Sequence, residues 1–130
     1  MKILLDESNV LFWRGVQADA ALPALVARAL IARRFSPHVI FDHSVWRHMG
    51  APEIEGLRAF VEVTTAPRGT PADAMLLARS KQGQCQIVSR DQFRAWRAQH
   101  PALRRDWVVT GQIGKGGRVS FSKKLRPAPL

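Results

Sequence analysis

Short apolar segments alternate with segments of helical periodicity along the chain, and no other sequence feature constrains the fold as much. In the helical segments, apolar residues recur every three or four positions, as on the buried face of an amphipathic helix. Short strands that alternate with helices are typical of βαβ units, whose strands lie parallel and whose crossovers are right-handed. The sequence therefore predicts an α/β fold, with strands at residues 2–6, 38–42, 60–64, 85–89 and 107–110, and helices at residues 20–34, 52–58, 70–81 and 91–99.

Turn-forming residues set the expected ends of some of these elements. Thr70 is predicted to be the N-cap of a helix, with Pro71 at the first helical position, and Gly83 is predicted to end that helix. The glycine-rich residues 111–117 are predicted to form a turn that leads into a last strand at residues 118–121.

The composition fits a single folded domain. The chain has 130 residues, of which 46% are hydrophobic, and this suffices for a core without disulfides. Its single cysteine, Cys85, excludes an internal disulfide and favours a reducing compartment. The first apolar stretch is interrupted at Asp6, and no apolar stretch is long enough to span a membrane. We therefore expect a cytoplasmic protein with no membrane partner, folded over residues 1–122 and ending in a basic tail at residues 123–130.

The charge of the chain is strongly positive. Twenty Lys and Arg residues face ten Asp and Glu residues, which gives a formal net charge of +10. From Arg94 onward there are nine basic residues and one acidic residue, Asp106. A positive field attracts polyanions, nucleic acid above all. We therefore expect a surface that binds phosphate groups, with a merely solvated basic surface as the alternative.

Several aspartates are expected at one edge of the sheet. Asp6, Asp42 and Asp91 lie at or just after the carboxyl ends of predicted strands, where open α/β sheets bind their ligands. Asp73 lies in the first turn of a helix that opens onto the same edge. Each has a purely structural alternative, namely an Asx turn, a capping box or an interaction with a helix dipole.

A cation would explain why these carboxylates gather. Two carboxylates about 5 Å apart repel each other by roughly 3 kcal/mol at an effective dielectric constant near 20. Oxygen ligands favour Mg²⁺ or Mn²⁺ over zinc. Such an ion polarises a phosphoryl group and activates water. Together with the basic composition, this pattern indicates hydrolysis of phosphodiester bonds.

Three segments, in this order, resemble the motifs of PIN-like nucleases, particularly of the NYN or Regnase-type branch. They are LLDESNV at residues 4–10, TPADAMLLARS at residues 70–80 and QIVSRDQFRAW at residues 86–96. The segment FDHSVWR at residues 41–47 matches more weakly. The resemblance implies a three-layer α/β/α sandwich whose mainly parallel sheet has the strand order 3-2-1-4-5.

The resemblance also implies an activity and a set of site residues. The implied activity is that of an endoribonuclease that depends on Mg²⁺ or Mn²⁺. Asp6, Asp73 and Asp91 match the acidic positions that hold the metal and catalyse the reaction, and Asn9 matches an asparagine that orders the site. The Regnase branch has paired aspartates at its central position, where this chain has Ala72 before Asp73. One carboxylate of the family pattern is therefore missing, and Asp42 is a candidate substitute.

Basic residues near the same edge are candidate contacts to RNA: Arg14, Arg47, Arg68, Arg90 and Arg94. Trp46, beside Arg47, could stack on a base. The main alternative is a non-catalytic RNA-binding module on the same fold, which Ala72 favours. A receiver-like domain would need an aspartate after the third strand, where the chain has Thr64 and Thr65. An acidic protein antitoxin and a second copy of the chain are further candidate partners besides RNA.

Overall fold

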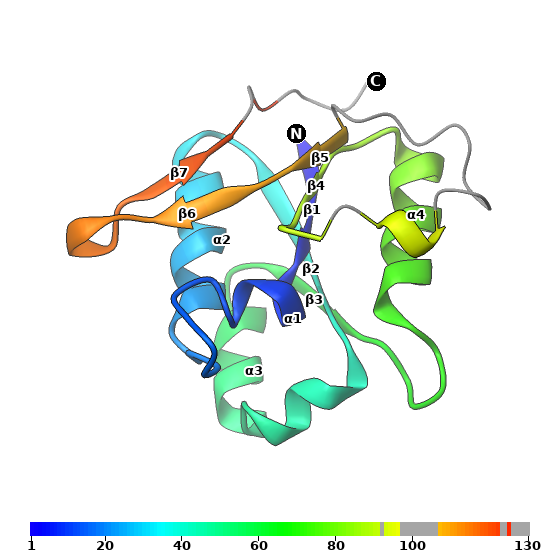
Figure 1. Cartoon of the computed structure of the whole chain (residues 1–130), viewed down its shortest axis with the longest axis horizontal. Helices are drawn as coiled ribbons and strands as arrows, with labels where there is room; N and C mark the ends of the chain where they lie inside the picture. The colour runs from blue at the N-terminus through cyan, green and yellow to red at the C-terminus, as the bar shows by residue number, and fades with distance from the viewer. Residues whose placement is uncertain (92, 97–106, 123–124, 126–130) are drawn as a thin grey trace.

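The computed structural model of the chain describes residues 1–91, 93–96, 107–122 and 125. Its central sheet is parallel, with the strand order β3-β2-β1-β4-β5 (Figure 1). The α/β class and the strand order predicted from the sequence are therefore confirmed. The strands are β1 (Lys2–Asp6), β2 (Ser36–Phe41), β3 (Glu62–Thr65), β4 (Ile87–Val88) and β5 (Val108–Val109).

Helices cover both faces of this sheet and complete the expected three layers (Figure 1). The helices α1 (Glu7–Val10), α2 (Leu22–Ala32) and α3 (Ala51–Arg58) contribute to one buried cluster, and α4 (Ala72–Gly83) contributes to the cluster on the other face. In the part of the chain that the structure describes, none of the helices is long and apolar enough to cross a membrane.

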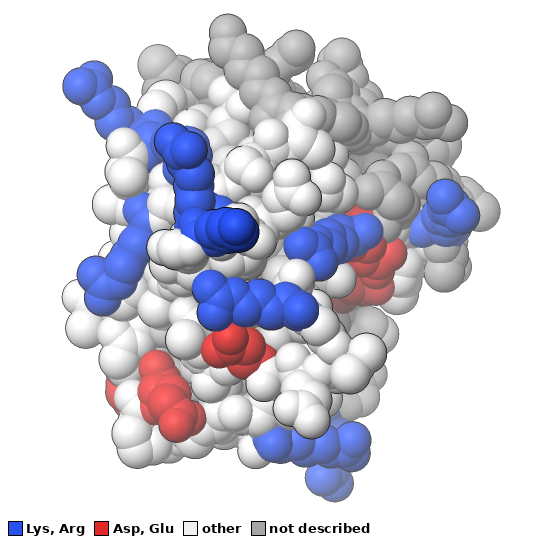
Figure 2. All heavy atoms as spheres, turned by 60° about the vertical axis from the view of Figure 1, so that its left-hand side comes forward, with Lys and Arg blue, Asp and Glu red and all other residues white. Residues whose placement is uncertain are grey.

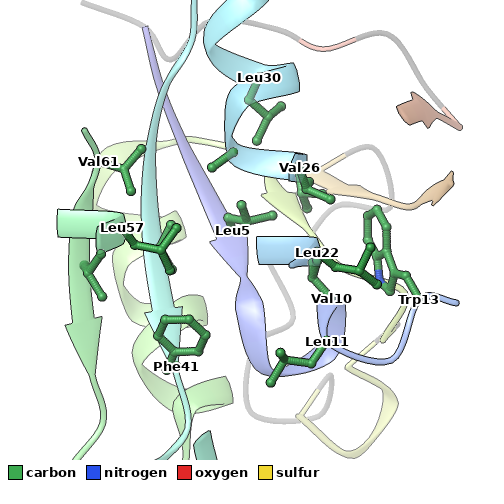
Figure 3. Close-up of a cluster of buried hydrophobic side chains, with 14 of the residues drawn as sticks. Leu5, Val10, Leu11, Trp13, Leu22, Val26, Leu30, Phe41, Leu57 and Val61 are labelled. Atoms are coloured by element: carbon green, nitrogen blue, oxygen red, sulfur yellow. The ribbon is translucent and has the colours of Figure 1, made fainter. Parts of the chain in front are cut away.

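The central strand β1 is buried on both faces. Ile3 and Leu5 belong to the cluster beneath α2 and α3, whereas Leu4 belongs to the cluster beneath α4. Figure 3 shows Leu5 among apolar side chains of the first cluster, with Val26 nearby on α2. Full burial of one such side chain stabilises a fold by about 1.5–3 kcal/mol. Packing on both faces therefore fixes β1, and with it the position of the aspartate at its carboxyl end.

Both ends of α4 differ from the prediction. Pro71 has an extended conformation (φ −64°, ψ 135°) and is itself the N-cap, so the helix begins at Ala72 and no side-chain bond from Thr70 caps it. At the other end, Gly83 is the last helical residue, and Gln84 takes the left-handed conformation (φ 51°) that was expected of the glycine. The predicted cap at Thr70 and the predicted stop at Gly83 were each one residue early.

The helix predicted at residues 91–99 is wrong over the described residues. Asp91 accepts a hydrogen bond from the backbone N–H of Phe93 through Oδ1 (2.8 Å), and Phe93 adopts a positive φ of 54°. Its side chain is buried in the cluster beneath α4. This local turn and the burial of Phe93 replace the first helical turn, and a short 3₁₀ segment follows at Arg94–Trp96. Residues 97–99 lie outside the described part, as do 123–124 and 126–130 of the predicted tail.

An antiparallel hairpin extends the chain beyond the sheet. The sequence predicted only a turn at residues 111–117, but Gly111–Ile113 forms strand β6 and pairs with β7 (Val119–Phe121). Figure 1 shows the hairpin projecting past α2. Arg33, which follows the last residue of α2, holds it there, because its guanidinium donates to the carbonyl of Val119 (3.2 Å) and lies 5.0 Å from the ring centroid of Phe121.

Gly111 should tolerate no side chain. A Cβ atom at this position would lie 2.7 Å from the ring of Trp13 and 2.9 Å from the carbonyl oxygen of Ser120. We expect Gly111→Ala to lower the free energy of unfolding by about 1–3 kcal/mol, as overpacking usually does. Gly56→Ala is the matched control, because nothing lies within 4 Å of its added Cβ on α3, and it should stabilise by about 0.5–1 kcal/mol. Urea unfolding of both variants checks these signs, and equal stability of the two would contradict them.

Candidate active site

Asp6 lies at the carboxyl end of β1 and is 4% exposed. Its Oδ2 accepts a hydrogen bond from the hydroxyl of Ser89 (2.8 Å), which follows β4. The same hydroxyl oxygen accepts a hydrogen bond from the backbone N–H of Asp91 (3.0 Å). Because β1 and β4 are neighbours in the sheet, Ser89 joins the segments that carry Asp6 and Asp91. The sequence analysis did not predict this bridging role of Ser89.

Two side chains of α1 connect β1 to the strands on either side. The Oδ1 atom of Asn9 accepts hydrogen bonds from the backbone N–H of Arg90 (2.8 Å) and from Nε1 of Trp13 (2.8 Å). On the other side, the hydroxyl of Ser8 accepts a hydrogen bond from the backbone N–H of Asp42 (2.7 Å). The single turn of α1 therefore ties together the carboxyl ends of β2, β1 and β4.

Asp73 lies in the first turn of α4, the helix that packs on the sheet face opposite to α2 and α3. Its carboxylate lies near the carboxyl ends of the strands, close to Asp91 and Asp42. Its Oδ2 accepts a hydrogen bond from Nε1 of Trp96 (3.1 Å). Asp42 follows β2, and its Oδ2 accepts from the backbone N–H of Ser44 (3.2 Å). We call the group formed by Asp6, Asp42, Asp73 and Asp91 the acidic edge.

The charges within the acidic edge affect one another. Burial raises the pKa of Asp6 to about 7; the hydrogen bond from Ser89 opposes this shift, and the charges of Asp73 and Asp91 add to it. Burial also raises the pKa of Asp73, and the charges of Asp91 and Asp42 add to that shift. Carboxylates raise one another's pKa only when they are close. The structure thus brings the three sequence-predicted acids into one electrostatic neighbourhood.

Asp42 behaves differently from the other acids. Burial favours a higher pKa, but hydrogen bonds with Ser44 and with the backbone of Ala72 and His43 outweigh it, so the pKa of Asp42 lies below its ordinary value. The carboxyl group of Asp42 is therefore ionised at neutral pH, and it already accepts hydrogen bonds from backbone N–H groups. Ala72 itself, the first residue of α4, is 4% exposed and belongs to the core cluster beneath that helix, so the position where the Regnase-type pattern has a further acid is an apolar core position here.

The described residues contain no tight cluster of metal ligands. Among the residues that the structure describes, no three His, Cys, Asp or Glu side chains converge closely enough to hold a metal ion together. The close convergence of three carboxylates expected from the sequence therefore does not appear in this arrangement. Mg²⁺ nevertheless commonly binds through one or two carboxylates and keeps several waters. The oxygen-only donors and the mutual repulsion of the acidic edge fit an ion bound in that way.

Glu7 is a buried acid that the sequence analysis missed. It is 0% exposed, and neither of its carboxyl oxygens has a hydrogen-bond partner among the described residues. Burial raises the pKa of Glu7 well above its ordinary value, and the charge of Asp6 adds to the shift. The only sequence signal is its place between a buried strand and the buried Val10, at a position that looked like part of a polar turn.

The five arginines predicted to contact RNA have different surroundings. Arg90 is engaged by the protein, since it donates to the carbonyls of Gly111 and Trp13 (both 2.9 Å) and lies 5.0 Å from the Trp13 ring centroid. Arg14 forms an exposed ion pair with Asp19 (3.6 Å). The remaining three are exposed: Arg47, Arg68 and Arg94.

Basic side chains also cover part of the surface formed by α2 and the β6–β7 hairpin. Figure 2 shows Lys and Arg spread over the side of the molecule that is turned forward from the left of Figure 1, with fewer acidic side chains between them. In Figure 1 this side carries α2 and the β6–β7 hairpin, whose described basic residues include Arg28, Arg33, Lys115 and Arg118. A field of this sign favours approach of a polyanion.

A parallel sheet of order 3-2-1-4-5, covered by helices on both faces, is the arrangement that the resemblance to PIN-like nucleases implied. Solved structures of the nuclear protein-only RNase P 2 (PRORP2) of Arabidopsis thaliana share it. One superposes with a TM-score of 0.72 at 15% sequence identity over 98% of this chain, and a second with a TM-score of 0.68 at 14% identity over 93%.

The comparison concerns only part of those proteins. The present chain spans 30% and 29% of the two RNase P chains, and at such low identity the likeness shows a common fold. No family model and no curated protein matches the sequence. The PIN-like fold is thus supported, and the narrower assignment to the NYN or Regnase-type branch is part of the proposal below.

Proposed function

We propose that the chain is a metal-dependent endoribonuclease of the PIN-like type, close to the NYN or Regnase branch. The observation that carries this proposal is the proximity of Asp6, Asp73 and Asp91 at one edge of the sheet, where the charge of Asp91 adds to the raised pKa of both Asp6 and Asp73, in a protein with a net charge of +10. The structural neighbours are named as RNase P, and this supports RNA as the substrate. Endonucleolytic cleavage is the mode that the family resemblance implies.

We expect the exposed acids of the acidic edge to bind the cation and the buried acid to accept a proton. Asp73 and Asp91 are partly exposed, whereas Asp6 is buried, so the first two are better placed to bind a cation directly. When bound, Mg²⁺ or Mn²⁺ supplies charge stabilisation to the phosphoryl oxygens and lowers the pKa of water. In the metal-free protein burial raises the pKa of Asp6 to about 7, and this makes Asp6 the candidate proton acceptor of the group. Hydrogen bonds from the hydroxyl of Ser89 and from the backbone of Asn9 hold this carboxyl group in place.

Hydrogen bonds orient these carboxylates. One oxygen of each of the three is fixed by a neutral donor: Asp6 by Ser89, Asp73 by Trp96 and Asp91 by the backbone of Phe93. Fixing one oxygen also fixes the direction of the other. Asn9 holds the chain segments of Asp6 and Asp91 in register through the backbone of Arg90. Such preorganisation lowers the cost of reaching the transition state.

Removal of divalent cations should abolish cleavage without abolishing RNA binding. We expect end-labelled RNA to be cut in Mg²⁺ or Mn²⁺, left intact in EDTA, and cut again when the metal is restored in excess. Phosphate contacts by Lys and Arg need no metal, so a salt-dependent mobility shift should persist in EDTA. Gel analysis of products and complexes under both conditions checks this. Cleavage of equal rate in EDTA would contradict a metal-dependent mechanism.

A non-catalytic RNA-binding module is the second candidate. Two observations favour it: no three acidic side chains of the described part converge on one point, and the buried Ala72 replaces a carboxylate of the family pattern. A binding module would give the salt-dependent shift but no products with any divalent cation. Cleavage that is lost in Asp6→Asn and Asp91→Asn would exclude it.

A further inference from the structure

A groove of about 710 Å³ opens beside the acidic edge. Its walls are two segments that leave neighbouring strands: residues 42–47 after β2, and residues 67–71 between β3 and α4. Ligand sites in proteins commonly have volumes of about 300–1,000 Å³. Asp42 belongs to both the groove and the acidic edge, so the groove runs directly into the proposed catalytic region.

The groove is lined on one side by Trp46, a tryptophan whose side chain is unusually exposed. Its side chain is 47% exposed, whereas Trp13 is buried and Trp96 and Trp107 are partly buried. An indole left half in water exposes a large apolar surface that a folded protein normally covers. In grooves that bind single strands, such rings serve as platforms on which bases stack, and the stacking tolerates any base.

Two arginines complete the groove from opposite walls. Arg47 follows Trp46, and Arg68 lies in the segment before α4. Within the described residues, neither guanidinium has a hydrogen-bond or ion-pair partner, unlike Arg14, Arg58 and Arg90. Unpaired guanidinium groups bind phosphate oxygens well, because their donors match the geometry of the anion.

We infer that this groove binds an unpaired nucleotide of the RNA, with its base stacked on Trp46 and the flanking phosphates held by Arg47 and Arg68. The inference rests on the proposed ribonuclease function and specifies its substrate: single-stranded RNA is favoured over duplex RNA. A base within a duplex is stacked on its neighbours and cannot lie flat on an indole. A nucleotide in the groove places the adjoining phosphodiester toward Asp42 and the acidic edge, where cleavage is proposed.

Binding in EDTA tests the groove separately from catalysis. We would measure the fluorescence anisotropy of a labelled 12-nucleotide single-stranded RNA, and of the same strand in a duplex, with intact protein. Trp46→Ala should weaken single-strand binding about ten-fold, as loss of one stacked base does, and should change duplex affinity less than two-fold. Trp46→Phe should retain most of the affinity. Phe12→Ala is the matched control, because Phe12 is 39% exposed and lies outside the groove.

The contribution of Arg47 and Arg68 is measured by the salt dependence of RNA binding. Arg47→Ala and Arg68→Ala should each reduce the slope of log K against log salt by about 0.7 for the single strand, and Arg58→Ala on α3 should leave it unchanged. Unchanged single-strand affinity in Trp46→Ala, or equal losses for single strand and duplex, would overturn the groove proposal even if the wild-type protein cleaves RNA. The expected losses without any cleavage in Mg²⁺ or Mn²⁺ would support the groove and refute the ribonuclease.

Discussion

Replacing Asp6 by asparagine is expected to reduce RNA cleavage by about a thousand-fold or more, because the variant loses several kcal/mol of transition-state stabilisation at about 1.36 kcal/mol per factor of ten. Asparagine has nearly the same shape and can still accept the hydrogen bond from Ser89, so the fold should persist. RNA affinity should stay the same or rise, since a negative charge is removed near the phosphates. Single-turnover cleavage and anisotropy measured on the same preparation check both parts.

The control for this variant is a distant acid of similar size. Glu55 lies on α3, is exposed and pairs with Arg58 at 3.3 Å. Glu55→Gln should leave cleavage within two-fold of the wild type. If Asp6→Asn lost binding and cleavage to the same extent while remaining folded, Asp6 would be a binding residue and the catalytic assignment would be wrong.

The free energy of unfolding of the metal-free protein is expected to fall as pH rises from about 4 to about 7. The Asp6 carboxyl releases its proton near pH 3.8 in the unfolded chain and near pH 7 in the folded protein. Between these values the folded state binds more protons, so stability that is present below pH 3.8 is lost by about pH 7. For Asp6 alone the loss is about 4 kcal/mol. The raised pKa values of Glu7 and Asp73 act in the same direction.

Urea unfolding at a series of pH values measures this effect as the difference in the free energy of unfolding between Asp6→Asn and the wild type. The stability of Asp6→Asn relative to the wild type should increase by about 4 kcal/mol between pH 4 and pH 7. The lowered pKa of His38 acts in the opposite direction but is common to both proteins. Added Mg²⁺ should stabilise the wild type more at pH 7 than at pH 5, because it binds the deprotonated carboxylates. A difference between the two proteins that does not change with pH would contradict the raised pKa of Asp6.

The fold could be predicted from the sequence because its determinants are local. The apolar runs of β1 and β2 and the three- and four-residue spacing in α2 each identify an element within a few residues. The family resemblance then supplied the strand order. Boundaries were less certain where two adjacent residues compete for one conformation, as Gly83 and Gln84 do at the end of α4.

The interior of the site could not be predicted in the same way, because long-range contacts determine it. The hydroxyl of Ser89 meets Asp6 across 83 positions in the chain, and Asn9 meets Arg90 across 81. Phe93 leaves the helical conformation because its ring is buried in the core cluster and its N–H is taken by Asp91. Glu7 looked like a surface residue in its local sequence, and only the packing of α1 against the sheet reveals its burial.

The central place of β1 also bears on how the protein is made. A ribosome releases β1 well before one of its neighbours, β4, which follows only at Ile87–Val88. Pairings between residues so distant along a chain form late and slowly. One side of a very apolar strand therefore stays without its neighbour until β4 has been synthesised, and chaperones would have their main opportunity to bind during that interval. A nascent chain that stops short of β4 also lacks Asp91 and Ser89, so the acidic edge lacks one of its four aspartates, and Asp6 lacks its hydroxyl donor, until β4 has been followed by these residues.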